Sequence, residues 1–246
     1  MNKLPKGTKA LIFAAGLGTR LKPFTDFHPK ALAIVNGKTL LQRNIQYLQS
    51  FGINDFVINV HHFADQIINF LQTNDNFGAV ISISHEIDQP LETGGGLLFA
   101  REHFQNCTTP FIIMNADILT NLNIGEMYNN YLKSTPLVSL AITNRISSRN
   151  LLFNQDQILC GWENTKTGEK RISRKHENLN PKAFSCVHIV NPTLLSLITQ
   201  KGVFSIIDTY LDLANNHIIL GYEHSNDLVV DVGKPESIFE AEKYFK

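Results

Sequence analysis

Short apolar runs alternate with amphipathic segments along the chain from Lys9 to Thr143. Five mainly apolar runs have the length of buried strands: residues 9–14, 56–60, 80–84, 111–114 and 137–143. Four segments between them carry apolar residues at helical spacing: residues 40–51, 64–71, 95–104 and 124–133. Because strand–helix alternation produces right-handed crossovers, this pattern predicts an α/β fold with a mostly parallel sheet and helices on both faces.

The pattern changes after Asn144, where short strand-like runs replace the alternation. Residues 152–153, 158–162 and 170–173 are such runs, separated by polar turns. We therefore expect a small antiparallel insertion, a β-flap, at 144–183 within one domain that spans 1–246. Strands at 184–190, 218–222 and 228–230 and helices at 194–199 and 205–214 should follow, and Pro235 suits the first turn of a last helix to Tyr244.

The composition is that of an ordinary globular domain. The chain has 246 residues, of which 43% are hydrophobic, and its net charge is zero. A balanced charge gives no general attraction to nucleic acid or to an anionic membrane, so we expect neither as a partner. No run approaches the roughly 20 apolar residues that span a bilayer, and the polar start does not resemble a signal peptide. We therefore expect a cytoplasmic protein.

A glycine-rich turn directly follows the first predicted strand. Its residues include Ala15, Gly16, Gly18, Thr19 and Arg20. Glycines let backbone N–H groups approach anionic oxygens, and a guanidinium offers a forked donor suited to phosphate. Lys30 supplies a second cation further on. The turn thus predicts a phosphate cradle, although a tight turn with a surface arginine would explain the same residues.

Two other nucleotide-binding motifs are excluded. The dinucleotide fingerprint needs a third glycine that opens a helix, and Leu21 stands at that position. The segment Gly37-Lys38-Thr39 resembles the end of a P-loop, but the earlier glycine of that motif would fall at Leu32. We interpret the segment as a turn in which Thr39 caps the following helix.

A second glycine-rich segment lies at residues 91–96. Leu91, Thr93 and Gly94 lead into two further glycines at positions 95 and 96. Three consecutive glycines at a helix start cost backbone entropy. Their presence is explained if a planar group such as a base lies directly against the backbone. A flexible turn capped by Thr93 is the alternative.

Two aspartates stand at the ends of predicted strands. Asn115-Ala116-Asp117 follows the apolar run 111–114, and Asp231 lies between valines. Carboxylates at the carboxyl ends of parallel strands face the ligand crevice, and a carboxylate in an apolar run is costly unless it is paired or binds metal. The two aspartates fit a Mg²⁺ that bridges phosphate oxygens. For Asp117, a helix cap is the alternative.

In chain order, segments 14–30, 91–95, 115–117 and 230–233 resemble the motifs of the sugar-nucleotide pyrophosphorylases, a nucleotidyltransferase family. The resemblance covers nearly the whole chain. It implies a Rossmann-like fold and an enzyme that joins an NTP and a sugar 1-phosphate to give an NDP-sugar and pyrophosphate. The residues that it assigns are Ala15, Gly16, Gly18, Thr19 and Asn115 at the nucleotide, Leu91, Thr93 and Gly94 at the base, Arg20 and Lys30 as catalytic cations, and Asp117 and Asp231 as Mg²⁺ ligands.

In its short length and in the sequence of residues 90–96, the chain resembles the branch of the family that joins UTP and N-acetylmuramic acid 1-phosphate in cell-wall recycling. Guanylyltransferases that act on mannose 1-phosphate or heptose 1-phosphate are the alternative, and cytidylyltransferases of polyol phosphates are a more distant one. A catalytically silent sugar-nucleotide sensor is a further alternative, although it would usually lose Arg20, Asp117 or Asp231. We expect a monomer or a small homo-oligomer.

The chain departs from the family pattern on the sugar side. Many members carry a Glu-Lys-Pro segment whose lysine contacts the sugar phosphate, whereas residues 162–164 are Trp-Glu-Asn. The glycine that follows an aromatic residue of the sugar-side strand is replaced by serine. The residues expected on this side are Glu86, Arg149, Phe184 and Ser185, and Lys170 and Arg171 are further candidate cations. For Glu86, a solvated acid in a loop is the alternative.

Overall fold

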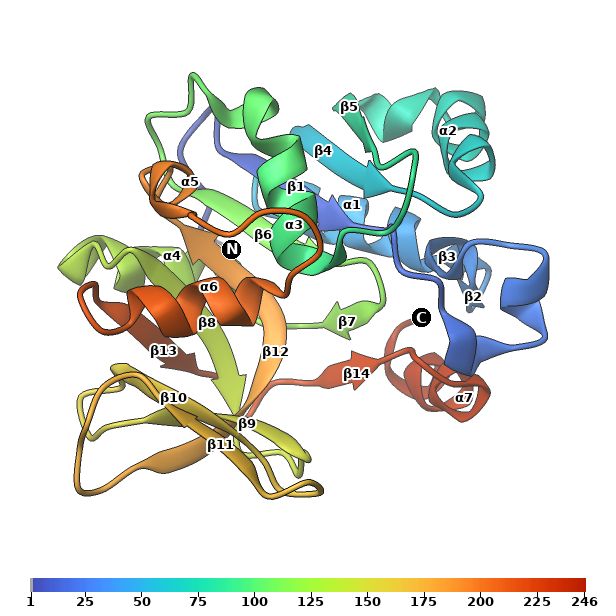
Figure 1. Cartoon of the computed structure of the whole chain (residues 1–246). Coiled ribbons are helices and arrows are strands. Elements are labelled where there is room, and N and C mark those ends of the chain that lie inside the picture. The colour runs from blue at the N-terminus through green and yellow to red at the C-terminus, as the bar shows by residue number, and fades with distance from the viewer. Residues whose placement is uncertain (1) are drawn as a thin grey trace.

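A computed structural model, which describes residues 2–246, is built around one large mixed β-sheet (Figure 1). Its strands run in the order β11-β10-β9-β12-β6-β1-β4-β5, with β8 paired to β12 and β13 paired to β8. They are β1 Lys9–Phe13, β4 Asp55–Val60, β5 Val80–His85, β6 Phe111–Asn115, β8 Val138–Thr143, β9 Arg149–Phe153, β10 Leu159–Asn164, β11 Glu169–Ile172, β12 Asn180–Val190 and β13 Ile219–Glu223. The strands of two smaller ribbons are β2 Ile34–Val35 with β3 Lys38–Thr39, and β7 Ile118–Thr120 with β14 Val229–Asp231.

The centre of the large sheet is parallel. Strands β5, β4, β1 and β6 pair in parallel, and β1, β4 and β6 are buried on both faces. Along β1, Ala10 and Ile12 belong to one buried apolar layer, and Leu11 and Phe13 belong to the other. Continuous apolar runs are typical of such strands, so the predicted α/β class is confirmed. The large sheet is mixed: it is parallel in this centre and at the β8–β13 pair, whereas all three pairings of β12 are antiparallel.

Helices cover both faces of the sheet (Figure 1). Those on the first apolar layer are α1 Leu40–Ser50, α2 Ala64–Thr73 and α4 Ile124–Ser134. Those on the second layer are α3 Glu92–Phe99, α5 Leu194–Leu197 and α6 Ile206–Leu213, while α7 Pro235–Tyr244 packs with β14 in a smaller cluster. Single 3₁₀ turns are η1 Thr19–Leu21, η2 Phe24–Asp26, η3 Lys30–Leu32, η4 Asp75–Gly78 and η5 Ala100–Phe104. Within residues 2–246, every helix is too short or too polar to cross a membrane.

Local capping signals act as the sequence predicts at two helices. The hydroxyl of Thr39 accepts a hydrogen bond from the backbone N–H of Gln42 and caps α1. The segment that resembles a P-loop is therefore a turn and a cap, as expected. Pro235 occupies the first turn of α7, where its missing N–H has no helical partner to lose.

Two helices differ from the prediction. Helix α5 has only 4 residues, so the helix expected at 194–199 is shorter. Helix α3 begins at Glu92, three residues before the expected start at Gly95. The carbonyl of Phe204 accepts the N–H groups of Gly94 and Gly95. It thereby satisfies donors of the first helical turn that lack partners within the helix.

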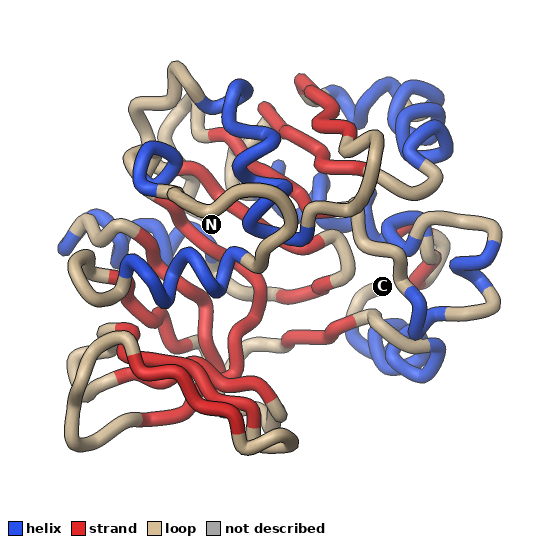
Figure 2. The backbone as a smooth tube through the Cα atoms, in the orientation of Figure 1, coloured by secondary structure: helices blue, strands red, loops and turns tan. Residues whose placement is uncertain are grey.

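Strands β9, β10 and β11 form the antiparallel flap, which continues through the first residues of β12. Figure 2 shows these strands at the lower left of the molecule, beyond the larger part of the sheet. Strand β9 is longer than the expected run at 152–153, because it begins at Arg149. Its apolar side chains, including Phe153 and Leu159, join the second core layer. An ion pair between Arg171 and Asp208 connects it to α6.

The ribbon of β7 and β14 joins distant parts of the chain. Asp231 in β14 pairs with Ile118 in β7. The backbone N–H of Val232 donates to the carbonyl of Asp117 over 2.8 Å. The pattern of apolar residues predicts β14 but not β7, which is too short to stand out. This pairing brings the segments of the two predicted metal ligands side by side.

Candidate functional site

A cavity of about 500 Å³ lies where β1 and β6 end and α3 begins. Its volume is within the range of small-molecule sites. The lining residues that the sequence analysis singled out are Ala15, Gly16, Gly18, Thr19, Lys30, Glu86, Thr93, Asn115 and Asp117. Segments far apart in the sequence thus contribute to one crevice at the carboxyl ends of parallel strands, where ligands of open α/β sheets bind.

The glycine loop between β1 and η1 is tightly held on one side and open on the other. Gly18 has a left-handed backbone with φ of 63°, and an added Cβ would lie 2.8 Å from the methyl group of Thr25. The hydroxyl of Thr25 donates to the carbonyl of Gly18 over 2.9 Å. At Gly16 an added Cβ would have no atom within 4 Å. The loop therefore has a defined shape and leaves open space at Gly16.

Two carboxylates and two cations meet beside this loop. The ammonium of Lys30 forms an ion pair with Asp117, and its Nζ lies 4.0 Å from Oδ1 of Asp231. The Nη2 atom of Arg20 lies 3.9 Å from Oδ2 of Asp231. The side chain of Lys30 is only 12% exposed, so its charge is less screened than that of a surface lysine. The cluster contains as many positive as negative charges.

The donor set of this cluster fits a divalent cation. Lys30 contacts Asp117 and reaches toward Asp231, so the space between the two carboxylates already attracts a positive charge. Within residues 2–246 there is no group of three or more His, Cys, Asp or Glu side chains that could hold a metal. Mg²⁺ is commonly held by one or two carboxylates together with substrate phosphates and water. Asp117 and Asp231 suit that mode of binding.

The run of glycines at the start of α3 has a packing role. A Cβ on Gly94 would overlap the ring of Phe204, and one on Gly96 would come within 2.7 Å of Glu86. The hydroxyl of Thr93 accepts a hydrogen bond from the N–H of Ile206 over 3.0 Å. Thr93 lines the cavity, whereas Gly94 faces the loop before α6 and, like Leu91, is outside the described cavity lining. Contact with a base stays a prediction for Leu91 and Gly94.

Glu86 is a buried part of the cavity wall. Its side chain is 2% exposed, so the alternative of a solvated loop acid is wrong. Its two carboxylate oxygens accept hydrogen bonds from Asn59 Nδ2 over 2.9 Å and from the N–H of Leu91 over 2.8 Å. Asn59, which also lines the cavity, follows no motif and was not predicted. The pair connects the end of β4 to the start of α3.

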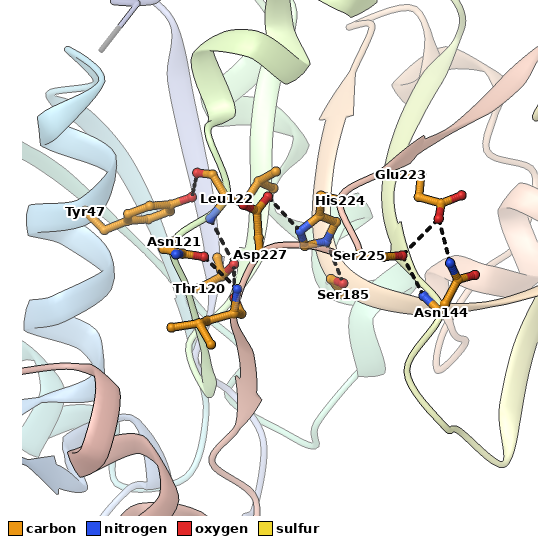
Figure 3. A network of polar contacts seen from close by, with 11 residues as sticks. Tyr47, Thr120, Asn121, Leu122, Asn144, Ser185, Glu223, His224, Ser225 and Asp227 are labelled. Carbon is orange, nitrogen blue, oxygen red and sulfur yellow. Dashed lines mark hydrogen bonds and ion pairs between the residues drawn. The ribbon is translucent and has the colours of Figure 1, made fainter.

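The predicted sugar-side residues lie in different surroundings. Ser185 is fully buried in β12, and its hydroxyl pairs with Nε2 of His224 over 2.9 Å, while His224 also faces Asp227 (Figure 3). Burial lowers the pKa of His224. Phe184 is half-buried beside Ser185, and Arg149 is exposed at the start of β9. Of the four expected sugar-side residues, Glu86 alone is among the residues that line the described cavity.

The two further candidate cations are paired within the flap region. Arg171 forms its ion pair with Asp208 of α6. The ammonium of Lys170 lies 3.9 Å from a carboxylate oxygen of Glu163 on the neighbouring strand. Both charges therefore have partners of opposite sign in the folded chain.

A family model described as nucleotidyl transferase matches residues 9–149, which contain the glycine loop, the glycine-rich helix start and Asp117. The chain belongs to the nucleotidyl transferase family. Asp231 lies outside the matched segment and joins the site through the β7–β14 ribbon. The match thus includes Arg20, Lys30 and Asp117 of the cluster but not Asp231.

Curated relatives fall into two groups. A mannose-1-phosphate guanyltransferase from Yarrowia lipolytica is 24% identical over 93% of this chain and 61% of its own length. An N-acetylmuramate alpha-1-phosphate uridylyltransferase from Caulobacter vibrioides is 42% identical over 102 residues, 41% of each chain. The chain spans about 60% of the length of the guanylyltransferases that it matches over most of its sequence.

Solved structures share the fold at low sequence identity. HddC from Yersinia pseudotuberculosis in complex with GMP-PN has a TM-score of 0.76 at 20% identity, covering 97% of this chain and 100% of the other. A putative glucose-1-phosphate thymidylyltransferase from Bacillus anthracis has a TM-score of 0.80 at 15% identity, covering 96% and 94%. These likenesses establish a nucleotidyltransferase fold.

Proposed function

We propose that the protein is a sugar-1-phosphate nucleotidyltransferase that converts an NTP and a sugar 1-phosphate into an NDP-sugar and pyrophosphate. The observation that carries this proposal is the meeting of Lys30, Asp117 and Asp231 at the end of a glycine loop that lines a cavity. Such a cluster suits a triphosphate, because it combines the accessible backbone of the glycine loop, the largely buried ammonium of Lys30 and two carboxylates that can hold a metal. Family membership supports the same reaction class.

In the proposed reaction, a phosphate oxygen of the sugar 1-phosphate attacks the α-phosphorus of the NTP in line, and pyrophosphate leaves. The attacking oxygen is already anionic, so the chain need not supply a general base. Mg²⁺, held by Asp117 and Asp231, would neutralise charge on the phosphate oxygens. Lys30 and Arg20 would bind the triphosphate and stabilise charge that develops on the leaving pyrophosphate. The glycine loop would hold the phosphates in the reactive orientation.

For the substrates, we propose UTP with N-acetylmuramic acid 1-phosphate. The 42% identity to the Caulobacter vibrioides uridylyltransferase, although it covers 41% of this chain, supports this choice. It would assign the protein to cell-wall recycling in the cytoplasm, as a monomer or a small homo-oligomer. GTP with mannose 1-phosphate is the second candidate, because relatives of that activity match over 93% of the chain. Heptose 1-phosphate is a further acceptor for the same test.

A substrate panel tests this proposal. Purified protein with Mg²⁺ is combined with UTP, GTP, CTP or dTTP and with each of the three sugar 1-phosphates, and pyrophosphate release is measured. We expect the highest turnover with UTP and N-acetylmuramic acid 1-phosphate. A preference for GTP and mannose 1-phosphate would contradict the proposed substrate pair but would still support the proposed reaction class. Absence of turnover with every pair would instead favour a sugar-nucleotide sensor.

A further inference from the structure

Strand β12 carries a bulge next to the carboxylate cluster. Val187 pairs with Met114 of β6, and the register with β8 shifts beyond Phe184. Within the bulge, Cys186 has φ of 55°, a left-handed conformation that is uncommon for residues with a side chain. Because β6 continues from Met114 into residues 115–117, the bulge lies beside the segment that ends in Asp117.

Arg145 lies at the same bulge, two residues beyond the end of β8. Its Nη2 atom donates to the carbonyl of Phe184 over 2.7 Å. The side chain is exposed, and within residues 2–246 no ion pair engages its guanidinium. A guanidinium has five N–H donors. The hydrogen bond to Phe184 therefore fixes its orientation and leaves most of its N–H groups available to an anion.

The electrostatics around Cys186 connect Arg145 with the carboxylate cluster. Burial raises the pKa of the Cys186 thiol to about 12, and the charges of Asp117 and Asp231 act in the same direction. Arg145 and Lys30 oppose this rise. The antiparallel pairing of Val187 with Met114 places the bulge alongside the segment that ends in Asp117, and the hydrogen bond to Phe184 holds the Arg145 guanidinium at that bulge.

The neighbouring lysine is already neutralised. Lys182 donates to Oδ1 of Asn144 and to Oε2 of Glu223, each over 2.7 Å, and the contact with Lys182 lowers the pKa of Glu223. Figure 3 shows Asn144 and Glu223 close together, on the far side of His224 from Asp227. Arg145, in contrast, has no carboxylate partner for its charge within residues 2–246.

We propose that Arg145 binds the phosphate of the sugar 1-phosphate acceptor. This inference rests on the proposed function and assigns the role that a lysine of a Glu-Lys-Pro segment would otherwise have. An acceptor phosphate must approach Asp117 and Asp231 to reach the α-phosphorus, and those carboxylates repel it. A guanidinium at the bulge offsets that repulsion and offers two parallel N–H donors, the geometry that matches phosphate oxygens.

Three arginine variants test the role of Arg145. Arg145→Ala removes the cation, Arg145→Lys retains the charge without the fork, and Arg101→Ala removes an exposed arginine at η5. For each, kcat and the KM values for the NTP and for the sugar 1-phosphate are measured with the best pair from the panel. Binding of N-acetylmuramic acid 1-phosphate and of mannose 1-phosphate is measured by calorimetry, with Mg²⁺ and a non-hydrolysable NTP analogue present.

We expect Arg145→Ala to lower kcat/KM for the sugar 1-phosphate by about 10- to 100-fold, the range of one charged hydrogen-bonding contact. The KM for the NTP and the melting temperature should stay near those of the wild-type protein, and Arg145→Lys should show an intermediate loss. Arg101→Ala should match the wild type. Unchanged sugar-phosphate KM and binding in Arg145→Ala, or an equal loss for both substrates, would overturn the inference.

The same experiment separates this inference from the proposed function. Turnover by the wild-type protein supports the reaction class whatever Arg145 does. Arg149→Ala is measured in the same way as a fourth variant. A loss in Arg149→Ala without one in Arg145→Ala would move the role to the arginine at the start of β9 and overturn the assignment to Arg145. If the wild-type protein neither binds nor turns over any sugar 1-phosphate, both proposals fall.

Discussion

At the residue scale, His188 is a histidine held neutral by its surroundings. It is 1% exposed in β12, and its Nδ1 atom shares a hydrogen bond with the hydroxyl of Tyr210 over 2.6 Å. Burial lowers the pKa of His188 from 6.5 to about 3. Between these values the unfolded chain binds a proton at this position and the folded chain does not. The stability that His188 contributes is therefore present above pH 6.5 and is lost as the pH falls toward 3.

We predict that His188→Gln weakens the pH dependence of stability in this window. The free energy of unfolding, measured by urea denaturation from pH 7 to about pH 4, should fall less steeply in the variant because it lacks the titrating ring. His176→Gln, at an exposed histidine, should follow the wild type. Equal slopes for His188→Gln and the wild type would mean that the buried ring contributes nothing to acid sensitivity.

At the element scale, local signals locate helix ends but not their partners. The cap at Thr39 and the first turn at Pro235 could be predicted because each depends on a few consecutive residues. The start of α3 could not, because the carbonyl that completes it belongs to Phe204, far along the chain. We expected a ligand base to be the reason for the consecutive glycines. In the folded chain, close packing against Phe204 in the loop before α6 is a second reason.

We predict that Gly94→Ala destabilises the protein by about 1–3 kcal/mol, as overpacking typically does. The added Cβ would overlap the ring of Phe204 and lie 2.9 Å from its carbonyl oxygen. The better helix propensity of alanine, worth about 1 kcal/mol, does not offset this. Removing the ring in Gly94→Ala with Phe204→Ala should give a smaller loss than the sum of the two single changes. Additive losses in urea denaturation would exclude the proposed clash.

At the scale of the whole molecule, the carboxylate cluster forms because a segment in the middle of the chain pairs with one near its C-terminal end. Asp117 follows the central strand β6, whereas Asp231 belongs to the last strand of the chain. The β7–β14 ribbon aligns them. Each aspartate was recognisable from its own segment, but their distance from Lys30 depends on this pairing.

We predict that turnover requires a divalent cation and both aspartates. EDTA should abolish pyrophosphate release, and added Mg²⁺ should restore it. Asp117→Asn should lower kcat by roughly 10²–10³-fold, the cost of one contact to the charge of the transition state, and should raise the Mg²⁺ concentration needed for half-maximal rate. Asp75→Asn, at an exposed position, is the control. Full turnover in EDTA would rule out the metal role of Asp117 and Asp231.

The sequence by itself determined the α/β class, the glycine loop and the candidate carboxylates. The class follows from the order of apolar runs and amphipathic segments along the chain, and the loop and the carboxylates follow from short stretches of consecutive residues. None of these requires knowing which distant segments pair. The tertiary structure alone decided that Asp117 and Asp231 meet at Lys30, that Phe204 completes α3, and that the bulge of β12 orients Arg145. These features depend on strand pairing and packing between distant segments, and no local pattern of residues determines which distant partner is chosen.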